Sequence, residues 1–150
     1  MKELDETIEV RATPQEVWAV LMDVESYGEW NPFLQIEGDL RVGARLSVQI
    51  SPVGERAMTI RPTVTMVKDG HELRWLGRLL MHGIFNGEHI FRIEEIDPGR
   101  VRFVQHERFT GVLVPFLWKR LRDGGTRKGF TAMNEALAAR VVERRVAGAR

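Results

Sequence analysis

Apolar and polar side chains alternate along much of the chain, which is the pattern of half-buried β-strands. In the first such segment, residues 4–12, Ile8 and Val10 share one face while Thr7 and Glu9 share the other. Six more segments of this kind are separated mostly by short turns containing Gly, Pro or Asp, and they cover residues 33–40, 44–51, 57–68, 71–79, 84–96 and 100–110. Because short links join antiparallel neighbours, we expect an antiparallel meander.

Two short helices are expected after the first strand. Thr13 and Glu16 have the spacing of a capping box, and Pro14 between them suits the first helical position because its missing N–H would be unpaired there anyway. A second short helix is expected from about Asp23, and it gives way at Gly28 to a Trp-Asn-Pro turn. Both helices therefore precede the six-strand region.

The end of the chain has a helical period instead. Apolar residues recur at steps of three and four, at Phe130, Met133, Leu137 and Val141. The pair Gly124-Gly125 weakens helix propensity, so residues 112–122 are expected to form a separate turn or a kinked first segment. Pro62 interrupts the strand at 57–68 and predicts a bulge or an edge position. These elements predict an α+β fold with the helices on one side of an antiparallel sheet.

Composition narrows the class of protein. A chain of 150 residues is about one domain, so we expect a single domain over 1–150 with one core. There is no cysteine, which excludes disulfides, a thiol nucleophile and thiolate metal sites. The net charge of +1 argues against broad nucleic-acid binding, although the chain from Trp118 onward is basic. The charged N-terminus and short apolar runs predict no secretory signal and no stable membrane insertion, with the cytoplasm as the default location.

Two polar side chains fall on faces that should be buried. His89 alternates in phase with Phe91 on one strand, and Glu107 alternates in phase with Phe103 on the next. Burying such groups costs several kcal/mol unless they are paired, hydrogen-bonded or in contact with water or a ligand, so we expect the interior to be a cavity. If these strands form a hairpin, Phe91 lies near Phe103, and His89 comes within a residue or two of Gln105.

Other kinds of site find no support. The four histidines are not spaced as a metal box, so no metal site is predicted. The chain has no glycine-rich phosphate loop and no Gly-x-Ser-x-Gly elbow, which argues against nucleotide binding and acyl hydrolysis. No cofactor is expected.

Several segments together make the chain resemble the START/Bet v 1-like (SRPBCC) superfamily, and within it the polyketide cyclase/dehydrase and lipid-transport group. The segments are Ala12-Thr13-Pro14 with Val17-Trp18, Tyr27 to Phe33, Leu73 to Gly77, Gly87 to Phe91, Glu107 to Gly111, and Gly129-Phe130 with Met133-Asn134. The resemblance implies a helix-grip fold, in which a seven-stranded curved antiparallel sheet wraps around the long C-terminal helix and encloses a deep cavity. Because this fold hosts many functions, the activity must be argued from the site.

The expected cavity lining combines aromatic, aliphatic and polar side chains. The candidates are Trp30, Asn31, Phe33, Trp75, Gly77, His89, Phe91, Phe103, Gln105, Glu107, Phe116, Phe130, Met133 and Leu137. The resemblance places the first three at the cavity mouth, where Asn31 either caps the turn or touches ligand. The aromatic residues and Met133 are either plain core or pocket wall.

Three interpretations of His89 and Glu107 stay open. They satisfy each other in a filled core, orient a ligand's polar group, or act as acid and base. The leading hypothesis is binding of a small hydrophobic or amphipathic ligand, such as a lipid, sterol or polyketide-like molecule, by a monomer or weak homodimer. The alternatives are a polyketide cyclase or dehydratase and a chaperone-activator-like module that binds a protein. Whether the protein is an enzyme is left open by the sequence.

Overall fold

The N-terminal elements follow the sequence prediction. A computed structural model describes residues 1–79, 81 and 83–148. Strand β1 (Lys2–Val10) leads into helix α1 (Pro14–Met22) and a 3-10 helix, η1 (Val24–Glu29). The capping box is confirmed, because Thr13 Oγ1 accepts from the backbone N–H of Glu16 at 3.2 Å and Glu16 Oε1 accepts from that of Thr13 at 2.9 Å. This start of α1 is therefore encoded locally.

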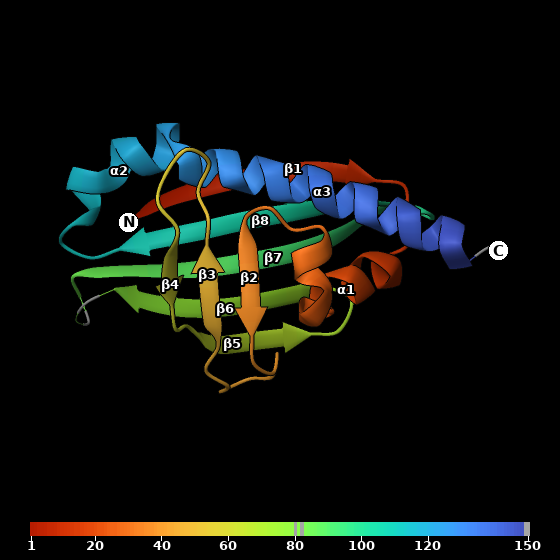
Figure 1. The fold of residues 1–150 in the computed structure, drawn as a ribbon, viewed down its shortest axis with the longest axis horizontal. Helices are drawn as coiled ribbons and strands as arrows, with labels where there is room; N and C mark the ends of the chain where they lie inside the picture. The colour runs from red at the N-terminus through yellow and green to blue at the C-terminus, as the bar shows by residue number, and fades with distance from the viewer. Residues whose placement is uncertain (80, 82, 149–150) are drawn as a thin grey trace.

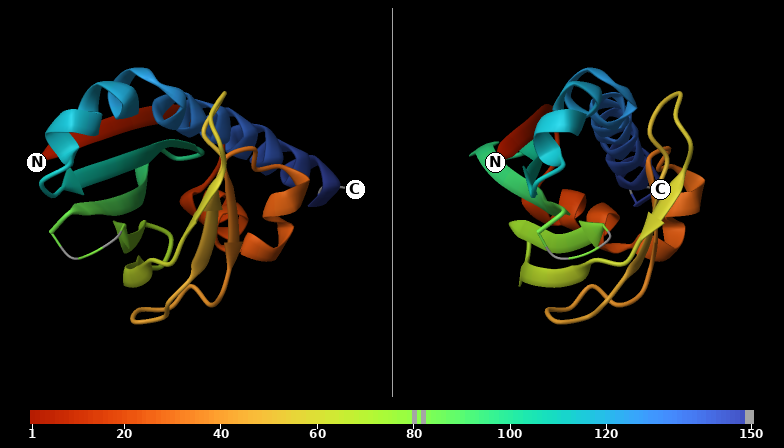
Figure 2. Two further views of the ribbon diagram at one scale, coloured as in Figure 1. Left: turned by 60° about the vertical axis from the view of Figure 1, so that its left-hand side comes forward. Right: turned by 90° about the vertical axis from the view of Figure 1, so that its left-hand side faces the viewer.

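The strands form two antiparallel sheets. One has the order β1-β8-β7-β6-β5 and the other β2-β3-β4. The bounds are β2 Leu34–Glu37, β3 Ser47–Ile50, β4 Met58–Ile60, β5 Thr63–Lys68, β6 Glu72–Leu79, β7 Phe85–Asp97 and β8 Arg100–Thr110. The two sheets form the sides of a cup, and the C-terminal helix lies across the opening between them (Figures 1 and 2).

The expectation of a single seven-stranded sheet is wrong. The segment expected as one strand over 57–68 divides at Pro62 into β4 and β5, which belong to different sheets. Proline has no N–H to donate to a ladder and restricts its own φ, so a regular strand does not run through it. An isolated bridge between Arg45 and Thr63 still joins the two sheets at this corner.

The C-terminal helix is divided as expected. Helix α2 (Val114–Asp123) and helix α3 (Gly125–Gly148) meet at the two glycines. A Cβ on Gly125 would lie 2.3 Å from the Val53 carbonyl oxygen, so glycine permits this close approach between the helix start and the loop after β3. Figure 1 shows α3 running across the five-stranded sheet while α2 lies toward its left-hand end.

The apolar stripe of α3 supplies much of the core. Its four predicted residues, Phe130, Met133, Leu137 and Val141, are each at most 1% exposed. Buried side chains of this size each contribute roughly 1.5–3 kcal/mol by leaving water. No helix in the described part of the chain is both long and apolar enough to cross a membrane.

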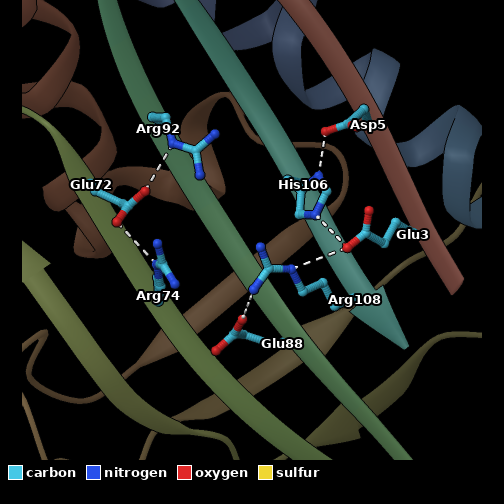
Figure 3. A network of polar contacts seen from close by, with 8 residues as sticks. All are labelled: Glu3, Asp5, Glu72, Arg74, Glu88, Arg92, His106 and Arg108. Carbon is cyan, nitrogen blue, oxygen red and sulfur yellow. Dashed lines mark hydrogen bonds and ion pairs between the residues drawn. The ribbon is translucent and has the colours of Figure 1, made fainter. Parts of the chain in front are cut away.

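The outer face of the five-stranded sheet carries paired charges (Figure 3). Glu72 accepts from Arg74 at 3.0 Å and from Arg92 at 2.9 Å, while Arg108 lies 3.2 Å from Glu3. Burial alone would raise the pKa of Glu72, but the hydrogen bonds from the two arginines outweigh it and hold the pKa below its usual range. Ion pairs on this face therefore join neighbouring strands of the sheet.

Candidate functional site

A pocket of about 460 Å³ opens at the end of the cup that α2 covers. One wall comes from the five-stranded sheet, with Trp75, Gly77, Phe85, Gly87, His89, Glu107 and Phe109. The facing wall includes Leu34, Ile50, Met58 and Ile60, and α2 adds Leu117 and Leu121. The volume falls in the range of small-molecule sites, roughly 300–1,000 Å³, and the lining is mostly apolar, as in such sites.

The structure brings only part of the predicted lining to this pocket. Phe33, Trp75, Gly77, His89 and Glu107 lie on its wall. Trp75 and His89 are direct cross-strand partners on β6 and β7, and their ring centroids are 5.4 Å apart. The residues from the sheet therefore form one patch on its inner face.

Another group of predicted residues lies in solid core. Phe91, Phe103, Phe130, Met133 and Leu137 are fully buried and are not part of the pocket lining. They belong to the apolar cluster around α3, whereas the pocket lies under α2. The interior is thus hollow at one end, because the alternation that predicts an inward side chain does not say whether a helix fills the space above it.

The predicted position of Phe116 is wrong. It was expected in the cavity, but it is 82% exposed on the outside of α2. Leu113, at the N-cap position of this helix, Leu117 and Leu121 face the pocket instead. The rotation of α2 depends on how its two ends are held, which its sequence pattern does not specify.

The turn before β2 lies beside the pocket. Asn31 Oδ1 accepts from the backbone N–H groups of Phe33 and Leu34, both at 2.9 Å, so this buried side chain caps the turn. Trp30 packs edge-on against Tyr27, with ring centroids 5.0 Å apart. Trp30 and Asn31 are not part of the pocket wall. Phe33, whose backbone N–H donates to Asn31, is part of it.

His89 and Glu107 meet in the pocket wall. They are paired across β7 and β8, and His89 Nδ1 lies 3.4 Å from Glu107 Oε2. The imidazole side chain is 5% exposed and the carboxylate side chain 17% exposed. The pocket therefore has an apolar lining with one largely buried ionisable pair, which can orient a polar group of a ligand or exchange a proton with it.

The hairpin forms with a register inside the expected range. Phe91 lies opposite Gln105, so His89 is two residues from the partner of Gln105, and the Phe91 and Phe103 ring centroids are 6.2 Å apart. The ladder is irregular close to the turn that sets the register, between Glu95 and Asp97. The faces predicted for both strands are also those of the structure, because His89, Phe91, Phe103 and Gln105 are all buried.

Gln105 connects the pair to α3. Its Oε1 lies 3.1 Å from His89 Nε2, and its Nε2 donates to the Phe130 carbonyl at 3.2 Å and to Asn134 Oδ1 at 2.8 Å. Gln105 and Asn134 are both buried. Gln105 and Glu107 thus contact different ring nitrogens of His89, Nε2 and Nδ1. Gln105 also links the imidazole to the helix.

The pocket rim is charged. Arg56, Arg78 and Arg120 belong to the lining together with Glu55. Glu55 is paired with Arg120 at 2.7 Å and also accepts from the Gly125 backbone N–H at 3.1 Å. The rim can therefore interact with a polar or anionic end of a ligand whose body lies in the apolar interior.

Sequence reasoning missed several wall residues. Phe85, Gly87 and Phe109 alternate in phase with His89 and Glu107, and that signal could have placed them. The facing wall and the α2 residues had no such signal, because they meet the sheet only in the folded chain. Within the described residues, no group of three or more metal-binding side chains is suited to hold a metal ion.

Comparison with known proteins identifies the family. The family model described as polyketide cyclase / dehydrase and lipid transport matches residues 1–145. The chain belongs to this family. No curated protein matches the sequence significantly.

Solved structures share the fold of this polyketide cyclase/dehydrase family member at low identity. Norcoclaurine synthase from Thalictrum flavum, in complex with dopamine and hydroxybenzaldehyde, has a TM-score of 0.72 at 17% identity, covering 95% of this chain and 87% of that chain. The Zhui aromatase/cyclase from a Streptomyces species has a TM-score of 0.71 at 20% identity, covering 97% of this chain and 95% of that chain. A protein of Mycobacterium smegmatis has a TM-score of 0.74 at 18% identity, covering 95% of this chain and 92% of that chain.

Proposed function

We propose that this protein binds a small, mainly apolar ligand in the pocket between the two sheets and α2. The observation that supports the proposal most is a 460 Å³ apolar pocket whose wall contains one ionisable pair, His89 and Glu107. Burying about 200 Å² of apolar ligand surface contributes on the order of 5 kcal/mol. A polar group buried with it needs a hydrogen-bond partner, which the pair supplies.

The relatives favour an aromatic or polyketide-like ligand. One structural neighbour holds dopamine and hydroxybenzaldehyde, and others are aromatase/cyclases. The wall of this pocket offers the rings of Trp75, Phe85 and Phe109, against which a flat ligand can stack. Lipids and sterols are also mainly apolar, so they are included among the compounds to be tested.

Binding can be tested by titrating the protein with polyketides, flavonoids, fatty acids and sterols while following tryptophan fluorescence. Trp75 lies in the wall, so a Trp75→Phe variant identifies its part of the signal. Gly77→Leu should abolish binding, because its side chain would project into the pocket from the same wall. A matched control is Val142→Leu, which enlarges a side chain on α3 that is 50% exposed. The proposal fails if no compound gives a saturable response, or if Gly77→Leu binds as the control does.

A second candidate function is polyketide cyclisation or dehydration. The specific observation in its favour is that the His89–Glu107 pair faces the pocket, where an acid and a base could meet a substrate. In an aldol condensation the base removes a proton from a carbon beside a carbonyl, and the enolate adds to a second carbonyl. The alkoxide gains a proton, and in the dehydration a second carbon-bound proton is removed while the protonated hydroxyl leaves as water. The pair is suited to exchange these protons.

Turnover of a linear polyketone separates the two functions. If the pair is catalytic, His89→Ala and Glu107→Gln should each lower the rate by about 100-fold or more while binding persists. Glu88→Gln, on the same strand as His89 but outside the pocket lining, is the matched control. Equal turnover in all three variants would exclude the catalytic role and leave the binding role standing.

A further inference from the structure

The orientation of the Gln105 side chain is fixed by α3. The Phe130 carbonyl oxygen can only accept, and it lies 3.2 Å from Gln105 Nε2. The amide NH₂ must therefore point toward the helix, where it also reaches Asn134 Oδ1 at 2.8 Å. The amide oxygen of Gln105 is left to face His89 Nε2 at 3.1 Å.

This orientation decides where His89 carries its hydrogen. Since Gln105 Oε1 can only accept, His89 Nε2 must be the donor. A neutral imidazole with its hydrogen on Nε2 has a lone pair on Nδ1, and Nδ1 lies 3.4 Å from Glu107 Oε2. An ionised carboxylate would repel that lone pair. A proton between Nδ1 and Oε2 converts the contact into an attraction.

From this geometry we infer that the His89–Glu107 pair holds one proton between Nδ1 and Oε2, so that Glu107 Oε1 presents a hydrogen-bond acceptor to the pocket. The same acceptor results whether the proton belongs to an imidazolium beside a carboxylate or to a carboxylic acid beside an imidazole. The ligand should therefore place a hydroxyl donor, such as a phenol or an enol, at this point. The inference rests on the proposed binding function and adds the chemical class of the ligand's buried polar group.

The surroundings of the carboxylate support this direction of Oε1. A Cβ on Gly87 would lie 2.7 Å from Glu107 Oε1, so the oxygen lies over the bare backbone of a pocket-wall glycine. Among the residues that the structure describes, His89 alone makes an ionic contact with the Glu107 side chain. Arg56 and Arg78 also line the pocket and can interact with the other end of the ligand.

The test compares 2-naphthol with 2-methoxynaphthalene, which have the same rings but differ in whether the oxygen can donate a hydrogen bond. One hydrogen bond to Glu107 Oε1 predicts that the wild-type protein binds 2-naphthol about tenfold more tightly. In Glu107→Leu the two affinities should come within about twofold, whereas Glu88→Gln should keep the wild-type ratio. A persistent preference in Glu107→Leu, or equal binding of both compounds by the wild type, would overturn the inference.

Failure of the inference differs from failure of the proposed function. If both compounds bind the wild type equally, the pocket stands and the proton assignment is wrong. If neither they nor the other titrated compounds bind, the binding function itself fails and the inference falls with it.

A second measurement does not depend on a ligand. Nitrogen NMR of labelled histidine should show a hydrogen on Nε2 of His89 in the wild type. Gln105→Leu should lower the share of His89 that carries its hydrogen on Nε2, because the acceptor is lost. Gln35→Leu is the same substitution outside the pocket lining and should leave that share unchanged. A wild-type imidazole with its only hydrogen on Nδ1 would contradict the inference.

Discussion

His89 and Glu107 lie directly opposite each other on β7 and β8, and their side chains approach to 3.4 Å in the wall of the pocket. A histidine and a carboxylate so placed are neither a solvated surface pair nor a fully enclosed one. They have one side against packed rings, since the His89 and Phe130 ring centroids are 5.1 Å apart, and the other side toward the pocket. This position explains why the sequence showed polar residues on an apolar face.

The same substitution on β7 should cost more stability in the packed core than beside the pocket. Phe91 and Phe85 both point inward from β7, but Phe91 is fully buried in the core and Phe85 lines the pocket. Phe91→Ala should lower the free energy of unfolding by about 3–5 kcal/mol, because it leaves a cavity in packed core. Phe85→Ala should cost clearly less, on the order of 1 kcal/mol, because empty space already adjoins the ring. Denaturant unfolding of both variants measures the difference, and equal losses would contradict a pocket that is hollow at one end.

Gly87 should be needed for the position of the Glu107 carboxylate. In Gly87→Ala the new Cβ would lie 2.7 Å from Glu107 Oε1, so the carboxylate must move. We expect the affinity for 2-naphthol to fall by about tenfold, the effect of one lost hydrogen bond to Glu107 Oε1. Glu88→Gln is the control at the next position of β7, because Glu88 is not part of the pocket lining. Calorimetric titration of both variants tests this, and an equal loss in both would argue against the carboxylate contact.

Gly129 should be required where α3 crosses Phe33. A Cβ there would lie 2.3 Å from Phe33 Cδ1, so Gly129→Ala overpacks the contact. Overpacking costs about 1–3 kcal/mol, which exceeds or offsets the roughly 1 kcal/mol that alanine gains over glycine in a helix. We therefore expect net destabilisation of up to about 2 kcal/mol, measured by urea unfolding.

Two controls make the Gly129 prediction specific. Gly148→Ala lies in the same helix with nothing near its Cβ, and it should change stability by no more than about 0.5 kcal/mol. In the Phe33→Leu background the loss caused by Gly129→Ala should shrink, because the ring is gone. If the loss is the same in both backgrounds, the contact with Phe33 is not its cause.

The arginine pair around Glu72 predicts a pH dependence of stability. Burial opposes the charged carboxylate, but hydrogen bonds from Arg74 and Arg92 lower the pKa of Glu72 below its unfolded value of about 4.3. The stabilisation is therefore present above that unfolded value and is lost as the pH falls through the lower, folded value. Unfolding of the wild type and Glu72→Gln should differ by up to about 1 kcal/mol at neutral pH and converge in acid.

The direction of this effect can be checked independently. With Arg74 and Arg92 both changed to Met, burial alone acts on the carboxyl and raises its pKa. Glu72 should then destabilise the fold as the pH rises, so the effect of Glu72→Gln on the pH dependence of unfolding should change sign. A difference between wild type and Glu72→Gln that grows toward acid would have the wrong sign and would contradict the assignment.

The sequence by itself determined the local elements and their faces. The capping box at Thr13 and Glu16, the glycine break between α2 and α3, and the inward positions of His89 and Glu107 all depend on residues close together in the chain. Such features follow from propensity, period and turn chemistry, which act over a few residues.

Only the tertiary structure decided where the interior is packed and where it is open. Phe91 and Phe85 have the same inward phase on one strand, yet α3 fills the space above the first and α2 leaves a pocket beside the second. The rotation that exposes Phe116 and the pairing of β4 and β5 into different sheets also depend on contacts between distant segments. Periodicity assigns a side chain to a face, but the volume above that face is set by the elements that pack against it.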